Sequence, residues 1–201
     1  KDKIVLITGA GGGIGACLVE EFFDRGAAKI YAADLNVDGL NKLKNKYENI
    51  VTLKLDVTQQ DDINNSVAIC ADVDILINNA GVELASPVFA ANSVKAAKLE
   101  MSVNCLGLHS LSVAFWDILK TKESCIMNML SIASFVYIPN ISTYCASKMA
   151  AHSITQAFRY ASIGTSVKVV GIYPGYVDTN MIKDMDVIKA TPQQLATNIC
   201  N

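Results

Sequence analysis

Short apolar runs alternate along the whole chain with longer segments whose apolar residues recur at helical spacing. The runs are rich in β-branched residues and contain few polar ones, which is typical of strands buried on both faces. The first helical segment places Ile14, Cys17, Leu18 and Phe22 on one face, as a helix packed on a sheet does. The pattern predicts strands at residues 4–7, 29–33, 51–55, 73–77, 125–130 and 167–173.

Helices are expected between these strands, the longest near residues 95–120 and 143–162. No repeat, low-complexity tract or linker interrupts the alternation, so we predict a single domain over residues 1–201. The order favours an α/β fold, a doubly wound parallel sheet of the Rossmann type with right-handed crossovers. Thr191 and Pro192 predict the start of a helix in which the sequence stops, so we expect a C-terminal continuation.

Composition narrows the possible partners. Hydrophobic residues make up 51% and charged residues 18%, which excludes a disordered chain. A net charge of -2 without a basic stripe argues against nucleic acid and anionic membranes, and no apolar stretch reaches the ~18 residues of a membrane span. Six scattered cysteines indicate reduced thiols and a cytoplasmic protein. Neither the cysteines nor the two histidines have the spacing of metal ligands, so no metal is expected.

A glycine-rich turn, Gly9-Ala10-Gly11-Gly12-Gly13-Ile14-Gly15, joins the first strand to the first helix. Glycines let the backbone approach a pyrophosphate closely, and the free N–H groups at the helix start stabilise its charge. Asp34 ends the second predicted strand 19 residues beyond Gly15, close to the ~20 expected of a ribose-binding carboxylate. Its charge would repel a 2′-phosphate, so NAD is favoured over NADP. The alternative is that Asp34 merely caps the next helix.

Tyr144 and Lys148 lie four residues apart in a predicted helix and so share one face. Lowering the pKa of a tyrosine from ~10 toward neutrality requires ~4 kcal/mol of preferential stabilisation of the phenolate. The lysine, together with a cationic nicotinamide, could supply much of it. Taken alone, such a pair is common on helix surfaces.

Taken together, these motifs resemble those of the short-chain dehydrogenase/reductase family over essentially the whole chain. The matching residues, in chain order, are Thr8 to Gly15, Asp34, Asp56-Val57, Asn78 to Gly81, Asn104, Ser131, Tyr144 with Lys148, and Tyr173-Pro174-Gly175 followed by Thr179. The resemblance implies a last strand beyond residue 201.

The resemblance implies a catalytic tetrad. Tyr144 would be the general acid/base, and Ser131 would hydrogen-bond the substrate oxygen. Lys148 would lower the pKa of Tyr144 and bind ribose, and Asn104 would distort its helix and position a water in the proton relay. Ser131 precedes Tyr144 by 13 residues, as in the family, which favours it over Ser134.

The resemblance and the turn together give the residues expected to bind NAD. Asp56 would meet the adenine, and residues 174–179 would close over the nicotinamide. The full set is Gly9, Gly12, Gly13, Ile14, Gly15, Asp34, Leu35, Asp56, Val57, Asn79, Ala80, Gly81, Tyr144, Lys148, Pro174, Gly175, Val177 and Thr179.

The leading hypothesis is therefore an NAD-dependent oxidoreductase that interconverts an alcohol and a carbonyl. Segments 83–88, 132–141 and 176–187 are expected to wall an apolar substrate pocket, with Phe135, Tyr137, Ile138 and Met181 available, so a small hydrophobic alcohol or carbonyl compound fits. The resemblance also implies a homodimer or homotetramer formed through the two long helices. A non-catalytic NAD-binding sensor or scaffold is the alternative. A methyltransferase would explain neither Ser131 nor the Tyr-Lys pair.

Overall fold

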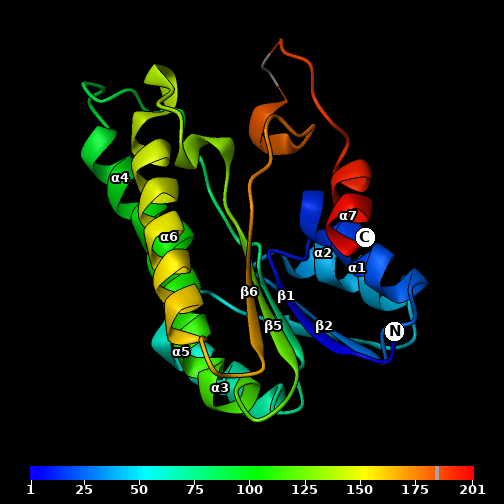
Figure 1. Ribbon diagram of the computed structural model, residues 1–201. Helices are drawn as coiled ribbons and strands as arrows, with labels where there is room; N and C mark the ends of the chain where they lie inside the picture. Colours follow the sequence, from blue (N-terminus) through cyan, green and yellow to red (C-terminus); the bar gives the residue numbers. More distant parts are fainter. Residues whose placement is uncertain (184–185) are drawn as a thin grey trace.

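The computed structural model describes residues 1–183 and 186–201 as one α/β domain. Six parallel strands form a single sheet in the order β3-β2-β1-β4-β5-β6, and helices cover both faces (Figure 1). The strands are β1 (Ile4–Thr8), β2 (Lys29–Asp34), β3 (Ile50–Lys54), β4 (Ile75–Asn78), β5 (Ser124–Met129) and β6 (Val167–Ile172). The predicted fold class is confirmed, and each predicted strand is present within two residues of its expected bounds.

Helices α1 (Gly13–Asp24), α2 (Val37–Lys46) and α7 (Pro192–Cys200) pack on one face of the sheet. The other face carries α3 (Gln60–Ile69), α5 (Leu108–Leu119) and α6 (Ser142–Ala161), with α4 (Ser93–Glu100) beside α6. Each face has its own core. Leu18 of α1 and Ile30 of β2 are fully buried on one side, and Phe115 of α5 and Leu76 of β4 on the other.

The long helix expected near residues 95–120 is interrupted. A π-helical segment, Met101–Gly107, separates α4 from α5 and contains Asn104. π-Bulges of this kind occur frequently at functional sites. The distortion that the family resemblance implied around Asn104 is therefore present.

The strand order reverses between β1 and β4, because the chain runs outward from β1 to β3 and then returns to place β4 on the other side of β1. In open parallel sheets, a crevice forms at this point outside the carboxyl ends of the strands. Here the glycine-rich turn after β1 and the segment after β4 meet: Asn79 donates from Nδ2 to the Thr8 carbonyl at 2.9 Å. The fold thus places both motifs at one edge.

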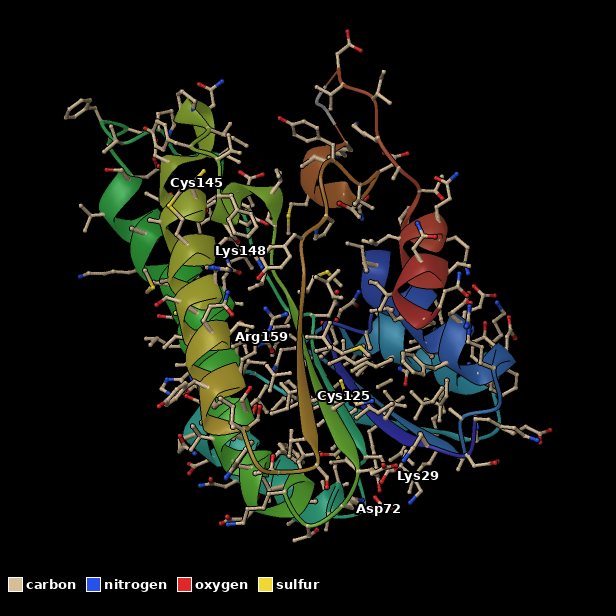
Figure 2. The ribbon with its side chains drawn as sticks, viewed as in Figure 1. Lys29, Asp72, Cys125, Cys145, Lys148 and Arg159 are labelled. Carbon is tan, nitrogen blue, oxygen red and sulfur yellow. The ribbon has the colours of Figure 1, made fainter. Side chains whose placement is uncertain are left out.

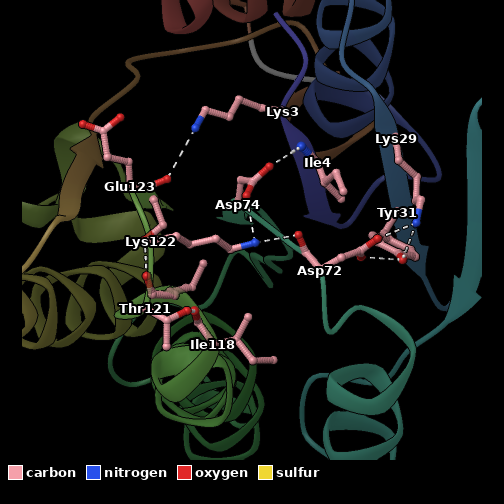
Figure 3. Close-up of polar contacts among 12 residues, drawn as sticks. Lys3, Ile4, Lys29, Tyr31, Asp72, Asp74, Ile118, Thr121, Lys122 and Glu123 are labelled. Carbon is pink, nitrogen blue, oxygen red and sulfur yellow. Dashed lines mark hydrogen bonds and ion pairs between the residues drawn. The ribbon is translucent and has the colours of Figure 1, made fainter.

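A polar network ties the strand starts together at the opposite edge (Figure 3). Asp74 accepts hydrogen bonds from the backbone N–H of Ile4 and the Lys122 amine, both at 2.8 Å. Asp72 accepts from the Tyr31 hydroxyl at 2.8 Å and also pairs with Lys29. These groups are partly exposed, so the network contributes modestly to stability and lies far from the crevice.

No helix in residues 1–183 or 186–201 combines the length and the apolar character needed to cross a membrane. In the same residues, His, Cys, Asp and Glu form no group suited to hold a metal ion.

Candidate active site

The crevice contains two adjoining cavities. The larger, of about 410 Å³, lies over the glycine-rich turn and the ends of β2 and β4. The smaller, of about 130 Å³, lies between the end of β5, α6 and the segment after β6. The two share lining residues, including Ile14, Gly81 and Thr179, so a molecule in one can touch a molecule in the other.

The glycine-rich turn has the shape of an anion cradle. Gly9 and Gly13 adopt left-handed conformations, with φ of +66° and +52°. A Cβ on Gly15 would lie 2.0 Å from the Gly9 carbonyl oxygen, so only glycine allows this helix to pack on the turn. Gly12 precedes α1 without a side-chain cap, which leaves the first N–H groups of the helix available to an anion.

Asp34 is fixed at the rim of the larger cavity. Its Oδ2 accepts a hydrogen bond from the Gly11 N–H at 2.7 Å, and its Oδ1 accepts from the Asn36 N–H at 2.8 Å. The cap of α2 is Asn36, whose side chain accepts from Gly39 N. The alternative in which Asp34 caps that helix is therefore wrong, and Asp34 faces the cavity with its orientation set by two backbone donors.

The larger cavity is lined by twelve of the residues expected to bind the cofactor. They are Gly9, Gly12, Gly13, Ile14, Asp34, Leu35, Asp56, Val57, Asn79, Ala80, Gly81 and Thr179. Pro174, Gly175, Val177, Tyr144 and Lys148 line the smaller cavity instead, and Gly15 is buried beneath the turn. The expected cofactor set omits seven other lining residues of the larger cavity: Gly11, Asn36, Leu55, Val82, Val103, Asn180 and Met181.

Three of the four expected catalytic residues line the smaller cavity: Ser131 after β5, and Tyr144 and Lys148 from α6. Lys148 projects from α6 toward the strands (Figure 2), where its amine donates to the Met129 carbonyl at 2.8 Å. The Ser131 Oγ accepts from the Ala133 N–H at 3.1 Å, which leaves its proton free to be donated. Ser134 instead bonds the Lys148 carbonyl.

Asn104, the fourth, is buried behind this cavity and holds the neighbouring loop. Its Oδ1 accepts from the Val82 N–H at 2.8 Å, and its Nδ2 donates to the Val82 carbonyl and to the Ser147 hydroxyl, both at 2.9 Å. Ser147 in turn donates to the Tyr144 carbonyl at 2.8 Å. Asn104 thus connects the loop after β4 to the turn of α6 that carries Tyr144.

Burial dominates the electrostatics of the pair on α6. It raises the pKa of Tyr144 to about 12, an effect that the nearby Ser131 hydroxyl partly offsets and that Glu83 and other acidic groups increase. Burial also lowers the pKa of Lys148 to about 8. The protein alone therefore does not lower the tyrosine pKa, and the expected lowering by Lys148 stays a prediction for the cofactor-bound site.

The expected walls of the substrate pocket are confirmed only in part. Ile138 and Met181 line the smaller cavity, but Phe135 and Tyr137 do not. Phe135 packs against His152 and Tyr173, with ring centroids 4.9 and 4.8 Å away. Within segment 176–187, residues 184 and 185 lie outside the described part of the chain.

Comparison with known proteins agrees with this architecture. Residues 3–187 match the family model for short chain dehydrogenases. An uncharacterized oxidoreductase of Staphylococcus saprophyticus is 31% identical over 196 residues, which cover 92% of this chain and 83% of the relative.

Two solved structures are similar over 98% of the chain. A short chain dehydrogenase from Burkholderia cenocepacia in complex with NADP has a TM-score of 0.92 and 31% identity, with 81% of its length covered. Serine dehydrogenase from Escherichia coli has a TM-score of 0.87 and 28% identity, with 89% covered. The chain therefore belongs to the short-chain dehydrogenases, a family of oxidoreductases that use a nicotinamide cofactor.

Proposed function

We propose that this chain binds NAD across the two cavities and interconverts a small alcohol and its carbonyl compound, with Tyr144 as the general acid/base. One observation carries the proposal: Tyr144, Ser131 and Lys148 line a cavity continuous with the glycine cradle. A protein that only bound the dinucleotide would not need a phenol, a hydroxyl and an amine around a second cavity.

The lining of the larger cavity fits a dinucleotide. The N-terminus of α1 and the backbone of the turn would hold the pyrophosphate, and Asp34 would accept hydrogen bonds from the adenosine ribose hydroxyls. Asp56 and Val57 line the same cavity and would meet the adenine.

Asp34 also supports the choice of NAD. A 2′-phosphate would meet its carboxylate, and the described residues that line the larger cavity include no Lys or Arg to neutralise that phosphate. The Burkholderia relative nevertheless binds NADP, so the preference belongs to the residues of this chain rather than to the family. Initial rates with NAD and NADP at matched concentrations, across alcohols of increasing size, test both the reaction and the preference.

When bound, the dinucleotide supplies or accepts a hydride at its nicotinamide ring. In the oxidation direction, Tyr144 Oη would take the proton of the substrate hydroxyl, and the hydride would leave the carbon that carries this hydroxyl. In the reduction direction, Oη would return that proton to the carbonyl oxygen. Ser131 would donate a hydrogen bond to the reacting oxygen in both directions. A positioned proton donor contributes ~10²- to 10⁴-fold to the rate.

The raised pKa of Tyr144 keeps its proton on the phenol at neutral pH in the protein alone. Reduction of a carbonyl can use that proton directly. Oxidation requires the phenolate, so the positive charge of the oxidised nicotinamide, added to that of Lys148, would have to bring the tyrosine pKa down. The lysine amine is close enough to take part, since it lies 5.7 Å from the centre of the tyrosine ring.

The exposed faces of the long helices support the expected homodimer or homotetramer. Leu99, Leu106 and Val113 recur every seven residues along α4, the π-helical segment and α5, and their side chains are 44%, 52% and 56% exposed. Exposed apolar side chains that recur along consecutive helical segments are typical of a surface covered by a second copy of the chain.

A further inference from the structure

A single carboxylate faces the substrate cavity. Among the described residues that line the smaller cavity, Glu83 is the only acidic one, and most of the others are apolar. It lies on the loop that follows β4 and is neither fully buried nor fully exposed. An ionised carboxylate in apolar surroundings is costly unless a donor or a cation compensates it.

The loop holds Glu83 in place from three sides. Asn104 bonds both the N–H and the carbonyl of Val82. Glu100, one helical turn before Asn104, accepts from the Leu84 N–H at 2.9 Å. Glu83 itself accepts from the N–H of Ala85, which adopts a left-handed backbone with φ of 45°. The position of the carboxyl group is thereby fixed before any substrate arrives.

One oxygen of the Glu83 carboxyl is free for a ligand. The bond to Ala85 uses Oε1, and the contacts within residues 1–183 and 186–201 include no hydrogen bond to Oε2 and no ion pair to Glu83. Glu100 is fully buried, and its own Oε2 also has no partner in that part of the chain. The Glu83 carboxyl at the cavity and the buried Glu100 carboxyl therefore lie close enough to repel each other, and neither forms an ion pair with a cation in the described residues.

The charges of this cluster favour a positive ligand group over a neutral one. Burial raises the pKa of Glu83, the hydrogen bond from the Ala85 N–H partly offsets this effect, and the nearby Glu100 raises the pKa further. An ammonium group beside Glu83 would offset both effects, whereas a neutral hydroxyl would supply only a hydrogen bond. Lys148 lines the same cavity, so the ammonium must lie away from that amine, toward the loop.

We propose that Glu83 is a specificity-determining residue that binds the ammonium group of an amino alcohol or amino ketone while Tyr144 and Ser131 hold its reacting oxygen. This inference rests on the proposed function, because it names the substrate class of the same site. The predicted substrate is then no longer purely apolar: it is apolar along its length and carries a positive charge at one end.

The experiment compares amino alcohols with alcohols in which a methyl group replaces the ammonium. The pairs are 1-amino-2-propanol with 2-butanol, 4-amino-2-butanol with 2-pentanol, and 5-amino-2-pentanol with 2-hexanol. The series varies the distance between the reacting carbon and the charge. Two quantities are measured: kcat/KM for oxidation with NAD, and the Kd of each alcohol for the enzyme–NADH complex by calorimetry, which needs no turnover.

We expect wild-type protein to prefer the amino member of at least one pair by about 10- to 100-fold, in both kcat/KM and Kd, as a charge-assisted hydrogen bond provides. Glu83→Gln keeps the side-chain size and the acceptor for Ala85, and it should bring that ratio close to one. Glu123→Gln removes an exposed carboxylate at the opposite edge of the sheet and should leave the ratio as in wild type.

Two kinds of result would overturn the inference: no preference for the amino member of any pair in either measurement, or a preference that survives Glu83→Gln. If the alcohols are oxidised without such a preference, the inference fails and the proposed function stands. If none is oxidised but Kd shows a Glu83-dependent preference for the amine, the recognition stands and the redox proposal fails.

Discussion

The amine of Lys148 lies 5.7 Å from the centre of the Tyr144 ring, one turn further along α6. Lys148 is buried and Tyr144 is half-buried, and burial shifts their pKa values in the directions that favour the neutral forms. Burying the two groups thus lowers the free energy of unfolding, and a bound cofactor can offset this loss.

Lys148→Met should reveal this cost as a pH dependence. The pKa of Lys148 is lowered from 10.5 to about 8, so between these pH values the unfolded chain binds more protons than the folded one. The contribution of Lys148 to the free energy of unfolding therefore rises with pH across that window. In urea unfolding without cofactor below pH 8, the free energy of unfolding of Lys148→Met should exceed that of wild type by at most about 3 kcal/mol. This difference in stability should shrink toward pH 10.5. A difference that grows with pH would contradict the lowered pKa of Lys148.

Asp34→Ser should relax the choice of coenzyme. The substitution removes the negative charge that would oppose a 2′-phosphate and weakens the hold on the ribose hydroxyls. The ratio of kcat/KM for NAD over NADP should fall by about tenfold or more, mainly through the KM values. Asp117→Asn, which changes an exposed carboxylate on α5 that lines neither cavity, is the matched control. An unchanged ratio in Asp34→Ser would show that Asp34 does not determine the choice between NAD and NADP.

Two glycines of the cradle should separate folding from binding. A Cβ on Gly15 would lie 2.0 Å from the Gly9 carbonyl oxygen, so Gly15→Ala should cost about 1–3 kcal/mol in the free energy of unfolding. A Cβ on Gly12 meets nothing within 4 Å, and its backbone is extended. Gly12→Ala should therefore unfold like wild type while binding NAD more weakly. Equal stability of the two variants would count against the close packing at Gly15.

The exposed apolar surface formed by Leu99, Leu106 and Val113 should govern oligomerisation. The double substitution Leu99→Lys and Val113→Lys places two charges on this surface, and light scattering should then show a smaller assembly than wild type. Ile69→Lys serves as the control, because Ile69 is an apolar residue at the end of α3 that is 53% exposed. If wild type is already monomeric at micromolar concentration, the proposed interface is wrong.

The framework of the fold follows from the sequence because apolar runs and helical spacing are local signals. Each predicted strand lies within two residues of the observed bounds, and the motifs at the carboxyl ends of the strands meet at one edge because a parallel sheet brings them there. The candidate site residues outside the cradle followed from a family resemblance, which rests on residue types in a given order and spacing.

The walls of the substrate cavity could not be predicted in the same way. Phe135 and Tyr137 lie in a loop, where no periodicity fixes side-chain direction, and both are more than half exposed outside the cavity. The free oxygen of Glu83 depends on contacts with Glu100 and Asn104, which lie 17 and 21 residues away in sequence. Nor does sequence spacing report burial, which is what raises the pKa of Tyr144 instead of lowering it.

The central claim is that the Tyr144 hydroxyl carries the proton of the reaction, and Tyr144→Phe tests it most directly. Phenylalanine keeps the ring in the cavity and removes only the oxygen. NADH formation from an alcohol oxidised by wild type should fall by at least about 10²-fold, while calorimetry should still detect NAD binding. Turnover at the wild-type rate in Tyr144→Phe would contradict the account.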